Sequence, residues 1–369
     1  MLEEFSDDLA SIRDQARRML DNIATPDHLK GLLDQPSTFD QPLWQQAVEL
    51  GWPCLSVPES AGGLELGWRG LSLLCEETGR VTASLPLMSN ALAVHALIQS
   101  SHSEFDNLLK GLSSGDSIAC LALNDPADSG IGQSSSASIT NGKITGEKSL
   151  SAFAMVADYA LTAANDNGTV GLYLVDLKQS GTERRATPAV DNARASASLS
   201  FQSAEAAFLG GPELLADITS IAALCSAFEQ ISGARACLDM GTTYAKDRTA
   251  FGQPIGRFQG LKHKLAEMYC LIEIGFGCAL DALAALESNS DDRHSLASAA
   301  HLAAIKAYGY AAQENLHIHG GMGVTWEAMP HHHYRRARTL ALELGSPKSW
   351  QNRLTASIGA RHPQRNGDN

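Results

Sequence analysis

Apolar residues recur at helical spacing over the first third of the chain. Those between residues 9 and 20 lie three or four positions apart, as on one face of an α-helix. A largely aliphatic run at 85–97 predicts a second, buried helix. We therefore expect residues 1–115 to form an α-helical N-terminal domain.

The spacing changes to that of β-strands between residues 116 and 211. Asn141-Gly142 lies between two short candidate strands, 137–140 and 143–146, and is a strong signal for a tight hairpin. Three further runs have strand length: 117–123, 159–164 and 170–175. The pattern predicts a mostly β middle domain over 116–211.

Helical spacing returns after residue 212. Long helices are expected at 213–250, 257–287, 294–318, 331–344 and 347–358. Long helices with short connections are typical of a helical bundle, which we place at 212–360. The polar end, 361–369, is expected to be disordered. The predicted fold class is α+β, with a helical domain, a β domain and a four-helix bundle in that order.

Charge and composition indicate which partners and which compartment to expect for this protein. A net charge of -13 argues against nucleic acid and against an anionic membrane surface. We find no apolar run approaching about 18 residues, so no membrane span is expected. The first twenty residues are charged and contain no signal-peptide core. Seven cysteines without a CxxC pair indicate reduced thiols in a cytoplasmic protein.

One arginine lies beside a sharp turn between two of the predicted bundle helices. Gly252 is flexible and Pro254 has no backbone N–H, so the helix cannot continue through them. Arg248 is thereby held next to the turn, where a guanidinium can bind an anionic group such as a pyrophosphate. Spacing alone also allows a plain helical hairpin with a surface arginine.

A dense group of histidines invites a metal-site hypothesis. His317 and His319 precede a run of three, His331 to His333. No H-E-x-x-H pattern or cysteine ligand set accompanies them, and neighbouring histidines point in different directions. We therefore expect no metal site.

Three stretches resemble one known family. Residues 248–259 read R-x-x-F-G-x-P-I-x-x-F-Q, residues 317–327 read HIHGGMGVTWE, and residues 44–79 form the third match. Together they are similar to the acyl-CoA dehydrogenase family. The resemblance implies FAD as cofactor, an acyl-CoA thioester as substrate, and electron-transferring flavoprotein as electron acceptor.

The same resemblance implies which residues touch FAD. In this family FAD lies across a subunit interface, so that motifs of one chain reach the cofactor held by another. The donor positions correspond to Arg248, Phe258, Gln259, His317, Gly320 and Gly321. A guanidinium and an amide suit phosphate oxygens, and glycines let backbone approach the nucleotide closely. His317 stands where the family usually has glutamine.

The receiving half of the cofactor site departs from the family pattern. Residues 124–130 replace the usual T-E-P-G-x-G-S-D, and Leu150-Ser151-Ala152 replaces the flavin-contacting W-I-T. Neither Leu150 nor Ala152 can form a hydrogen bond through its side chain. Ser220 and Ala223 stand where an Asp and an Arg usually contact the CoA-bound substrate.

The catalytic base of the family is missing from its usual position. Desaturation between Cα and Cβ needs a carboxylate that removes the α proton while hydride goes to the flavin. The usual Glu-Gly-Thr corresponds to Leu344-Gly345-Ser346, and Glu343 lies one residue early, about 100° around a helix. The second known position falls near Ala222, with Glu229 two turns further on. Glu229 and Glu343 are therefore weak candidates.

These features favour one subunit of a heteromer. The motifs resemble those of bacterial enzymes that desaturate CoA thioesters of steroid side chains, some of which are heteromers with the base on one subunit type. We expect an α2β2 assembly with a homologous chain, in which this chain completes the partner's FAD site. Two alternatives remain open: a homomeric dehydrogenase using Glu229 or Glu343, and a scaffold or binding protein of the same fold without redox activity.

Overall fold

The computed structural model describes residues 7–35, 39–100, 105–127 and 135–361. The first group of helices comprises α1 (Asp7–Ile23), α2 (Pro26–Leu33), α3 (Gln41–Glu49), α4 (Gly67–Arg80), α5 (Leu87–Ser100) and α6 (Asp106–Ser114). The second comprises α7 (Pro212–Asp247), α8 (Gln259–Glu287), α9 (Arg293–His319), α10 (Pro330–Glu343) and α11 (Pro347–Arg361). Between them lies a sheet, so the expected fold class is confirmed.

The sheet contains eight strands. They are β1 (Ala119–Ala122), β2 (Ser138–Thr140), β3 (Lys143–Ser151), β4 (Tyr159–Asp166), β5 (Thr169–Asp176), β6 (Thr182–Ala186), β7 (Ala197–Glu205) and β8 (Ala207–Gly210). The order is β6-β7-β3-β2-β4-β5-β8, with β1 paired in parallel to β4. Asn141 and Gly142 both have positive φ and join β2 to β3, as expected of a hairpin turn.

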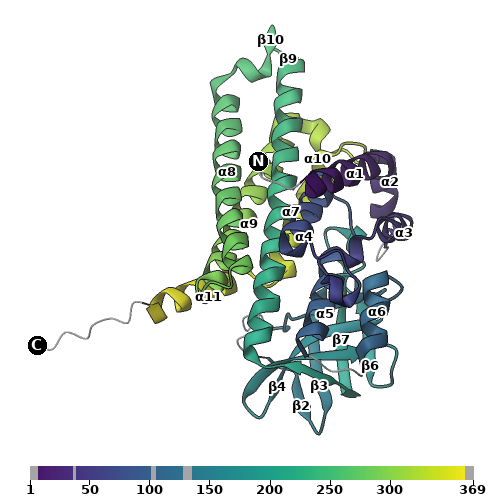
Figure 1. Ribbon diagram of the computed structural model, residues 1–369. Helices are drawn as coiled ribbons and strands as arrows, with labels where there is room; N and C mark the ends of the chain where they lie inside the picture. The colour runs from purple at the N-terminus through teal and green to yellow at the C-terminus, as the bar shows by residue number, and fades with distance from the viewer. Residues whose placement is uncertain (1–6, 36–38, 101–104, 128–134, 362–369) are drawn as a thin grey trace, which may run out of the picture.

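Helix α7 is the central element of the bundle. It runs beside α8 and α9, and α4 crosses it from the other side (Figure 1). Gly79 of α4 lies so close to α7 that a Cβ there would be 2.1 Å from the carbonyl oxygen of Glu229. Only glycine permits this approach, which brings the first group of helices against the middle of α7.

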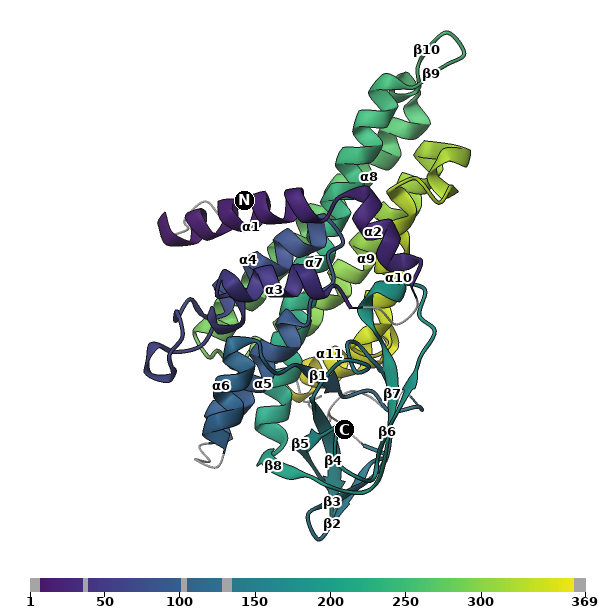
Figure 2. The ribbon, with the colours of Figure 1, turned by 90° about the vertical axis from the view of Figure 1, so that its right-hand side faces the viewer.

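Helices α7 and α8 are joined at one end of the molecule by a short hairpin. It consists of β9 (Thr249–Ala250), β10 (Gln253–Pro254) and a 3-10 turn, Ile255–Arg257. In Figures 1 and 2 this hairpin projects beyond the rest of the chain. The expected helix at 213–250 thus ends at Asp247, because the chain turns into β9 there.

The statement that no apolar stretch reaches membrane-spanning length was wrong. Both α7 and α8 contain 18-residue windows long and apolar enough to cross a membrane. The window in α7 is 83% buried by the surrounding helices, as befits a core helix, and that in α8 is 39% buried. α8 therefore leaves an apolar face, with Tyr269 and Ile274 exposed, uncovered by this chain.

Two further expectations concern segments that lie partly outside the described residues. Asp128 to Gly130, part of the segment compared with the flavin-cradling strand, lies outside the described residues. So does 362–369 of the expected disordered tail, whereas Arg361 is the last residue of α11. The strands β6, β7 and β8 were not anticipated from the sequence.

Candidate active site and cofactor-binding residues

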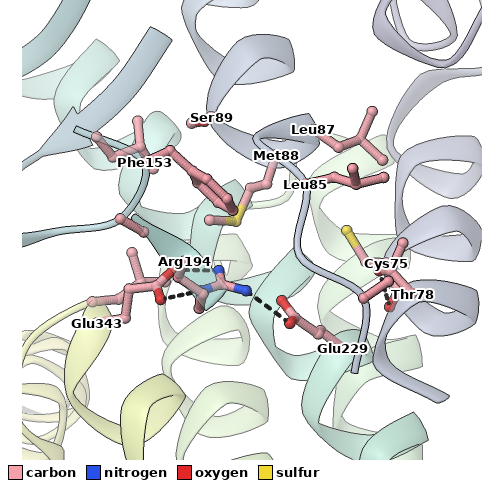
Figure 3. Close-up of a pocket in the computed structure, with 14 residues that line it drawn as sticks. Cys75, Thr78, Leu85, Leu87, Met88, Ser89, Phe153, Arg194, Glu229 and Glu343 are labelled. Atoms are coloured by element: carbon pink, nitrogen blue, oxygen red, sulfur yellow. Dashed lines mark hydrogen bonds and ion pairs between the residues drawn. The ribbon is translucent and has the colours of Figure 1, made fainter. Parts of the chain in front are cut away.

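The two glutamates singled out as candidate bases face one pocket. Glu229 comes from the middle of α7 and Glu343 from the last turn of α10. The α4–α5 helices and the end of β3 complete the wall (Figure 3). Leu344, at the family's usual base position, also lines this pocket, as does Ala152 of the replaced flavin-contacting triplet.

An arginine that the sequence analysis missed occupies the space between the two glutamates. Arg194 donates from Nε and Nη2 to the two carboxylate oxygens of Glu343, at 2.6 Å each. Its Nη1 donates to Oε1 of Glu229 at 3.1 Å. Figure 3 shows the guanidinium pointing between the two carboxylates. A bidentate pair of this kind is geometrically specific and strong.

A second buried arginine extends the network to three parts of the chain. Arg336 of α10 donates to Oε1 of Glu229 at 2.9 Å and forms an ion pair with Asp191. It also donates to the carbonyl oxygens of Thr82 and Ala83, at 2.7 and 2.8 Å. The network therefore fixes the α4–α5 connection, the middle domain and α10 to one another around the pocket.

Burial and charge act in opposite directions on these groups. Burial by itself lowers the pKa of the Arg194 guanidinium, but the carboxylates of Glu343 and Glu229 outweigh it and raise that pKa above its ordinary value. For Asp191 the signs are opposite: burial by itself raises the pKa of the carboxyl group, but the adjacent Arg336 guanidinium outweighs burial. The pKa of Asp191 is therefore lowered below its ordinary value. Both groups are thus held in their charged forms inside the protein.

The aromatic ring of Phe153 closes the pocket further. Phe153 is buried, and its ring lies 5.2 Å from the Arg194 guanidinium. Its backbone has φ of +60°, a conformation that is strained for a bulky residue. The pocket leaves a cavity of about 30 Å³, far below the roughly 300–1,000 Å³ of small-molecule sites.

The expected cofactor donors gather at the far end of the bundle. Arg248 caps α7, Phe258 caps the start of α8, and Gln259 is the first residue of α8. His317 and Gly320 lie at the end of α9, which a stack of Tyr244 on His319 holds against α7, with ring centroids 4.2 Å apart. The structure therefore brings the sequence-predicted donor positions to one end of the molecule.

These donor groups are open to solvent. The Arg248 side chain is exposed and forms no hydrogen bond or ion pair with the described residues. Gln259, Gly320 and Gly321 are exposed too, and a Cβ added at either glycine would meet nothing within 4 Å. Gly320 has φ of +58°, which favours glycine. An unpaired guanidinium, an amide and accessible backbone fit the phosphates of a dinucleotide.

His317 differs from the other donor positions. It is exposed, but its Nδ1 lies 3.3 Å from a carboxylate oxygen of Glu314, which also pairs with Lys264. His317 therefore already has a partner within its own chain.

Phe258 is half-buried, and its ring lies edge-on to that of Phe251, 6.2 Å away.

The donor end cannot reach the pocket of its own chain. Arg248 and Glu229 lie on the same helix, nineteen residues apart. At 1.5 Å per residue this separates them by about 28 Å. The donor end and the pocket therefore lie at separate places along α7.

The receiving half of the site does not fit a flavin in the same way. Asp125, in the segment that replaces the cradling strand, accepts from the buried ammonium of Lys148 at 2.6 Å. Ser151 Oγ is buried without a hydrogen-bond partner among the described residues. Ser220, at a CoA-contact position, lies 2.8 Å from Nδ1 of His294. Asp125 and Ser220 are thus engaged within the fold, whereas the Ser151 hydroxyl is left without a partner there.

The described residues hold no group of three or more metal-ligating side chains. His331 lies 3.0 Å from the carbonyl oxygen of Trp326, and His333 lies 2.9 Å from the hydroxyl of Tyr308. The imidazoles of His331 and His333 are thus directed to separate partners within the fold.

The chain belongs to the acyl-CoA dehydrogenase family. Residues 6–116 match its N-terminal domain and residues 214–356 its C-terminal domain. Members of this family are FAD-dependent oxidoreductases that act on the CH–CH group of acyl-CoA thioesters, and FAD is accordingly the cofactor.

Two curated relatives and a solved structure illustrate the likeness. Acyl-CoA dehydrogenase IpdE2 of Mycolicibacterium smegmatis is 28% identical over 96% of this chain and 99% of its own. IpdE2 of Mycobacterium tuberculosis is 29% identical over 94% and 96%. A variant of the Tcur3481–Tcur3483 steroid acyl-CoA dehydrogenase superimposes with a TM-score of 0.91, at 26% identity over 96% and 98%.

A second solved structure shares the fold. The ChsE4–ChsE5 complex from Mycobacterium tuberculosis superimposes with a TM-score of 0.90, at 22% identity, covering 97% of this chain and 99% of the matched chain.

Proposed function

We propose that this chain is one subunit of a heteromeric acyl-CoA dehydrogenase. In this proposal it completes the FAD site of a homologous partner, and the partner supplies the catalytic base. The observation that carries the proposal is the double engagement of Arg194 by Glu343 and Glu229. A carboxylate that accepts a bidentate guanidinium cannot take a substrate proton without breaking those bonds.

Two further observations support a subunit that completes the FAD site while its partner supplies the base. The pocket has no room for an acyl chain, since Arg194 and Phe153 occupy it. The donor end, by contrast, offers Arg248 and exposed glycine backbone with no use in its own chain. An intact donor end with a closed pocket is what a cofactor-completing subunit requires.

The substrate class proposed for the assembled enzyme is a CoA thioester of a steroid side chain. Its support is the similarity to a solved steroid acyl-CoA dehydrogenase over nearly the whole chain. An α2β2 assembly and electron-transferring flavoprotein as acceptor complete the proposal.

The second candidate is a homomeric dehydrogenase. It is favoured by one observation, that both Glu229 and Glu343 do line the pocket. In that case Arg194 has to move aside when substrate binds.

The absorption spectrum of purified protein separates the candidates. The chain is prepared alone and co-expressed with a homologous chain, and bound flavin is quantified per chain. Flavin only in the co-expressed complex supports the heteromer, and flavin in the single chain supports the homomer. Absence of flavin from both contradicts both candidates and favours a non-redox scaffold.

A further inference from the structure

The two donor glycines, Gly320 and Gly321, lie in a segment that packs little against the rest of the chain. The segment covers residues 320–329, between α9 and α10, and begins with a 3-10 turn. In that turn Met322 and Val324 are 60% and 69% exposed. Side chains of the turn therefore do little to fix the glycines, and contacts further along the segment have to do so.

Trp326 joins this segment to two helices. Its Nε1 donates to Oδ1 of Asp34, the residue that caps the end of α2, at 3.0 Å. Its ring stacks on that of His331 in α10, with centroids 5.1 Å apart and planes at 17°. The guanidinium of Arg335, one turn further along α10, lies 5.0 Å from the same indole ring. One side chain thus links the donor segment to both α2 and α10.

The backbone of Trp326 is held by the same imidazole that stacks on its ring. Nε2 of His331 lies 3.0 Å from the carbonyl oxygen of Trp326. A carbonyl oxygen only accepts, so Nε2 carries the hydrogen and donates it. Because His331 contacts both the carbonyl and the ring, it fixes the direction in which the indole leaves the chain.

The groups that hold the indole are themselves fixed in place. Arg335 donates from Nη1 to the carbonyl oxygen of Val190 at 2.9 Å. The end of α2 is tied to the middle domain, because Nδ2 of Asn192 donates to the carbonyl oxygen of Leu33 at 3.1 Å. The backbone N–H of Asp34 closes the last turn of α2. The indole is therefore held between preformed partners.

We infer that Trp326 is a positioning residue for FAD, which holds the backbone of Gly320 and Gly321 in the arrangement that meets the cofactor of the partner subunit. The inference rests on the proposed function, since the glycines serve a shared cofactor only in the assembled enzyme. Trp326 acts through the backbone that precedes it, and no contact between its ring and FAD is required. Without the indole, the segment has to be ordered when FAD binds, and this ordering lowers the affinity.

The first test uses the full chain without its partner and therefore does not depend on the proposed function. Hydrogen exchange of the backbone amides at 321–325 reports how often this segment opens. Trp326→Ala should exchange at least tenfold faster there than wild type. Asp34→Asn keeps an acceptor oxygen and should exchange as wild type does. Glu327→Ala, at an exposed neighbouring position without a hydrogen bond or ion pair to the described residues, is the matched control.

The second test measures FAD affinity rather than turnover. The assembled enzyme is stripped of flavin and titrated with FAD, and the dissociation constant is taken from the change in flavin fluorescence. Trp326→Ala should raise that constant at least tenfold. Trp326→Phe keeps an aromatic ring for His331 and Arg335 but loses the N–H, and should recover most of the affinity.

A destabilised variant separates positioning from a general loss of stability. Leu20 is fully buried in α1, so Leu20→Ala should lower the melting temperature more than Trp326→Ala does. Its FAD dissociation constant, measured well below the melting temperature, should stay at the wild-type value. An equal rise in that constant for Leu20→Ala would mean that any loss of stability weakens FAD binding, and would overturn the inference.

Two further outcomes overturn the inference while leaving the proposed function intact. One is wild-type exchange at 321–325 in Trp326→Ala, and the other is wild-type FAD affinity in that variant. A wild-type complex that binds no FAD refutes the proposed function instead, and the role of Trp326 in FAD binding falls with it. Exchange in the single chain then still decides whether Trp326 orders the segment.

Discussion

Arg194 and Glu343 form a buried bidentate ion pair between residues 149 positions apart in sequence, with both N–O distances 2.6 Å. Their side chains are only 4% and 6% exposed. Removing one member leaves the other charged and unpaired inside the protein. Buried pairs broken in this way typically cost about 3–5 kcal/mol, whereas apolar replacement of both members is often nearly neutral.

This pair gives the first prediction. Arg194→Met alone should lower the free energy of unfolding by about 3–5 kcal/mol, and Arg194→Met with Glu343→Met should recover part of that loss. Urea unfolding of the wild type, both single variants and the double variant completes the cycle. Strict additivity of the two single losses would show that the pair has no coupling energy.

The second prediction concerns the donor end. Arg248→Ala should lower FAD retention by the assembled enzyme much more than it lowers the melting temperature, because its guanidinium is exposed and unpaired within the described chain. A charge-assisted hydrogen bond to phosphate is worth about 1.5–3 kcal/mol. Flavin per chain is measured from the absorption spectrum. Arg257→Ala, an exposed arginine in the adjoining turn, is the control, and full flavin occupancy in Arg248→Ala would refute the assignment.

The third prediction concerns assembly through α8. Tyr269 and Ile274 are 56% and 61% exposed in a helix whose most apolar window is mostly uncovered. We expect light scattering to report about four chains, and Ile274→Asp to shift the assembly towards smaller species. Asp281→Ala, at an exposed polar position of the same helix, should leave the mass unchanged. A wild-type monomer in solution would remove the basis for a shared cofactor site.

The fourth prediction concerns acid. Burial lowers the pKa of His301 to about 3, and neither ring nitrogen has a hydrogen-bond partner among the described residues. The unfolded chain has a histidine pKa of about 6.5, so below that pH the unfolded state binds the proton more readily. The part of the unfolding free energy that depends on a neutral His301 is fully present above about pH 6.5. It is lost progressively as the pH falls towards 3.

The size of this effect follows from the gap between the two pKa values. Between pH 7.5 and pH 5, His301 should contribute about 2 kcal/mol of acid destabilisation. His301→Leu should reduce the difference in unfolding free energy between these pH values by about that amount. His263→Leu, which removes an exposed imidazole, is the matched control. An unchanged difference in His301→Leu would show that this imidazole does not govern the acid response.

The sequence predicted the order of elements better than it predicted the site. The hairpin at Asn141-Gly142 and the long bundle helices follow from local patterns, and the structure has them. β6 was missed because its sequence, TERRA, is largely exposed and has no apolar alternation. Local pattern carries no information on a strand that is defined by its neighbours.

The sequence predicted only part of the residues that form the site. Glu229 and Glu343 were singled out, but their shared partner was not, since Arg194 lies 35 residues from one and 149 from the other. One signal was present: Arg194 lies in a run of small residues, between Ala193 and Ala195, which are buried. An arginine in a buried small-residue segment requires an anionic partner, although only the fold identifies which one.

The last prediction tests whether this chain contains a working base. Glu229→Gln and Glu343→Gln should each leave the turnover of the assembled enzyme within about threefold of wild type, with flavin content and melting temperature measured alongside. Loss of a general base typically costs about 10²–10⁴-fold in rate. Glu343 is bound at both oxygens by Arg194, and Glu229 accepts from both Arg194 and Arg336, so neither is free to accept a substrate proton. A hundredfold fall in kcat for either variant, with flavin retained, would identify that glutamate as the base and favour the homomeric enzyme. Unchanged rates in both would direct the search for the carboxylate to the partner chain.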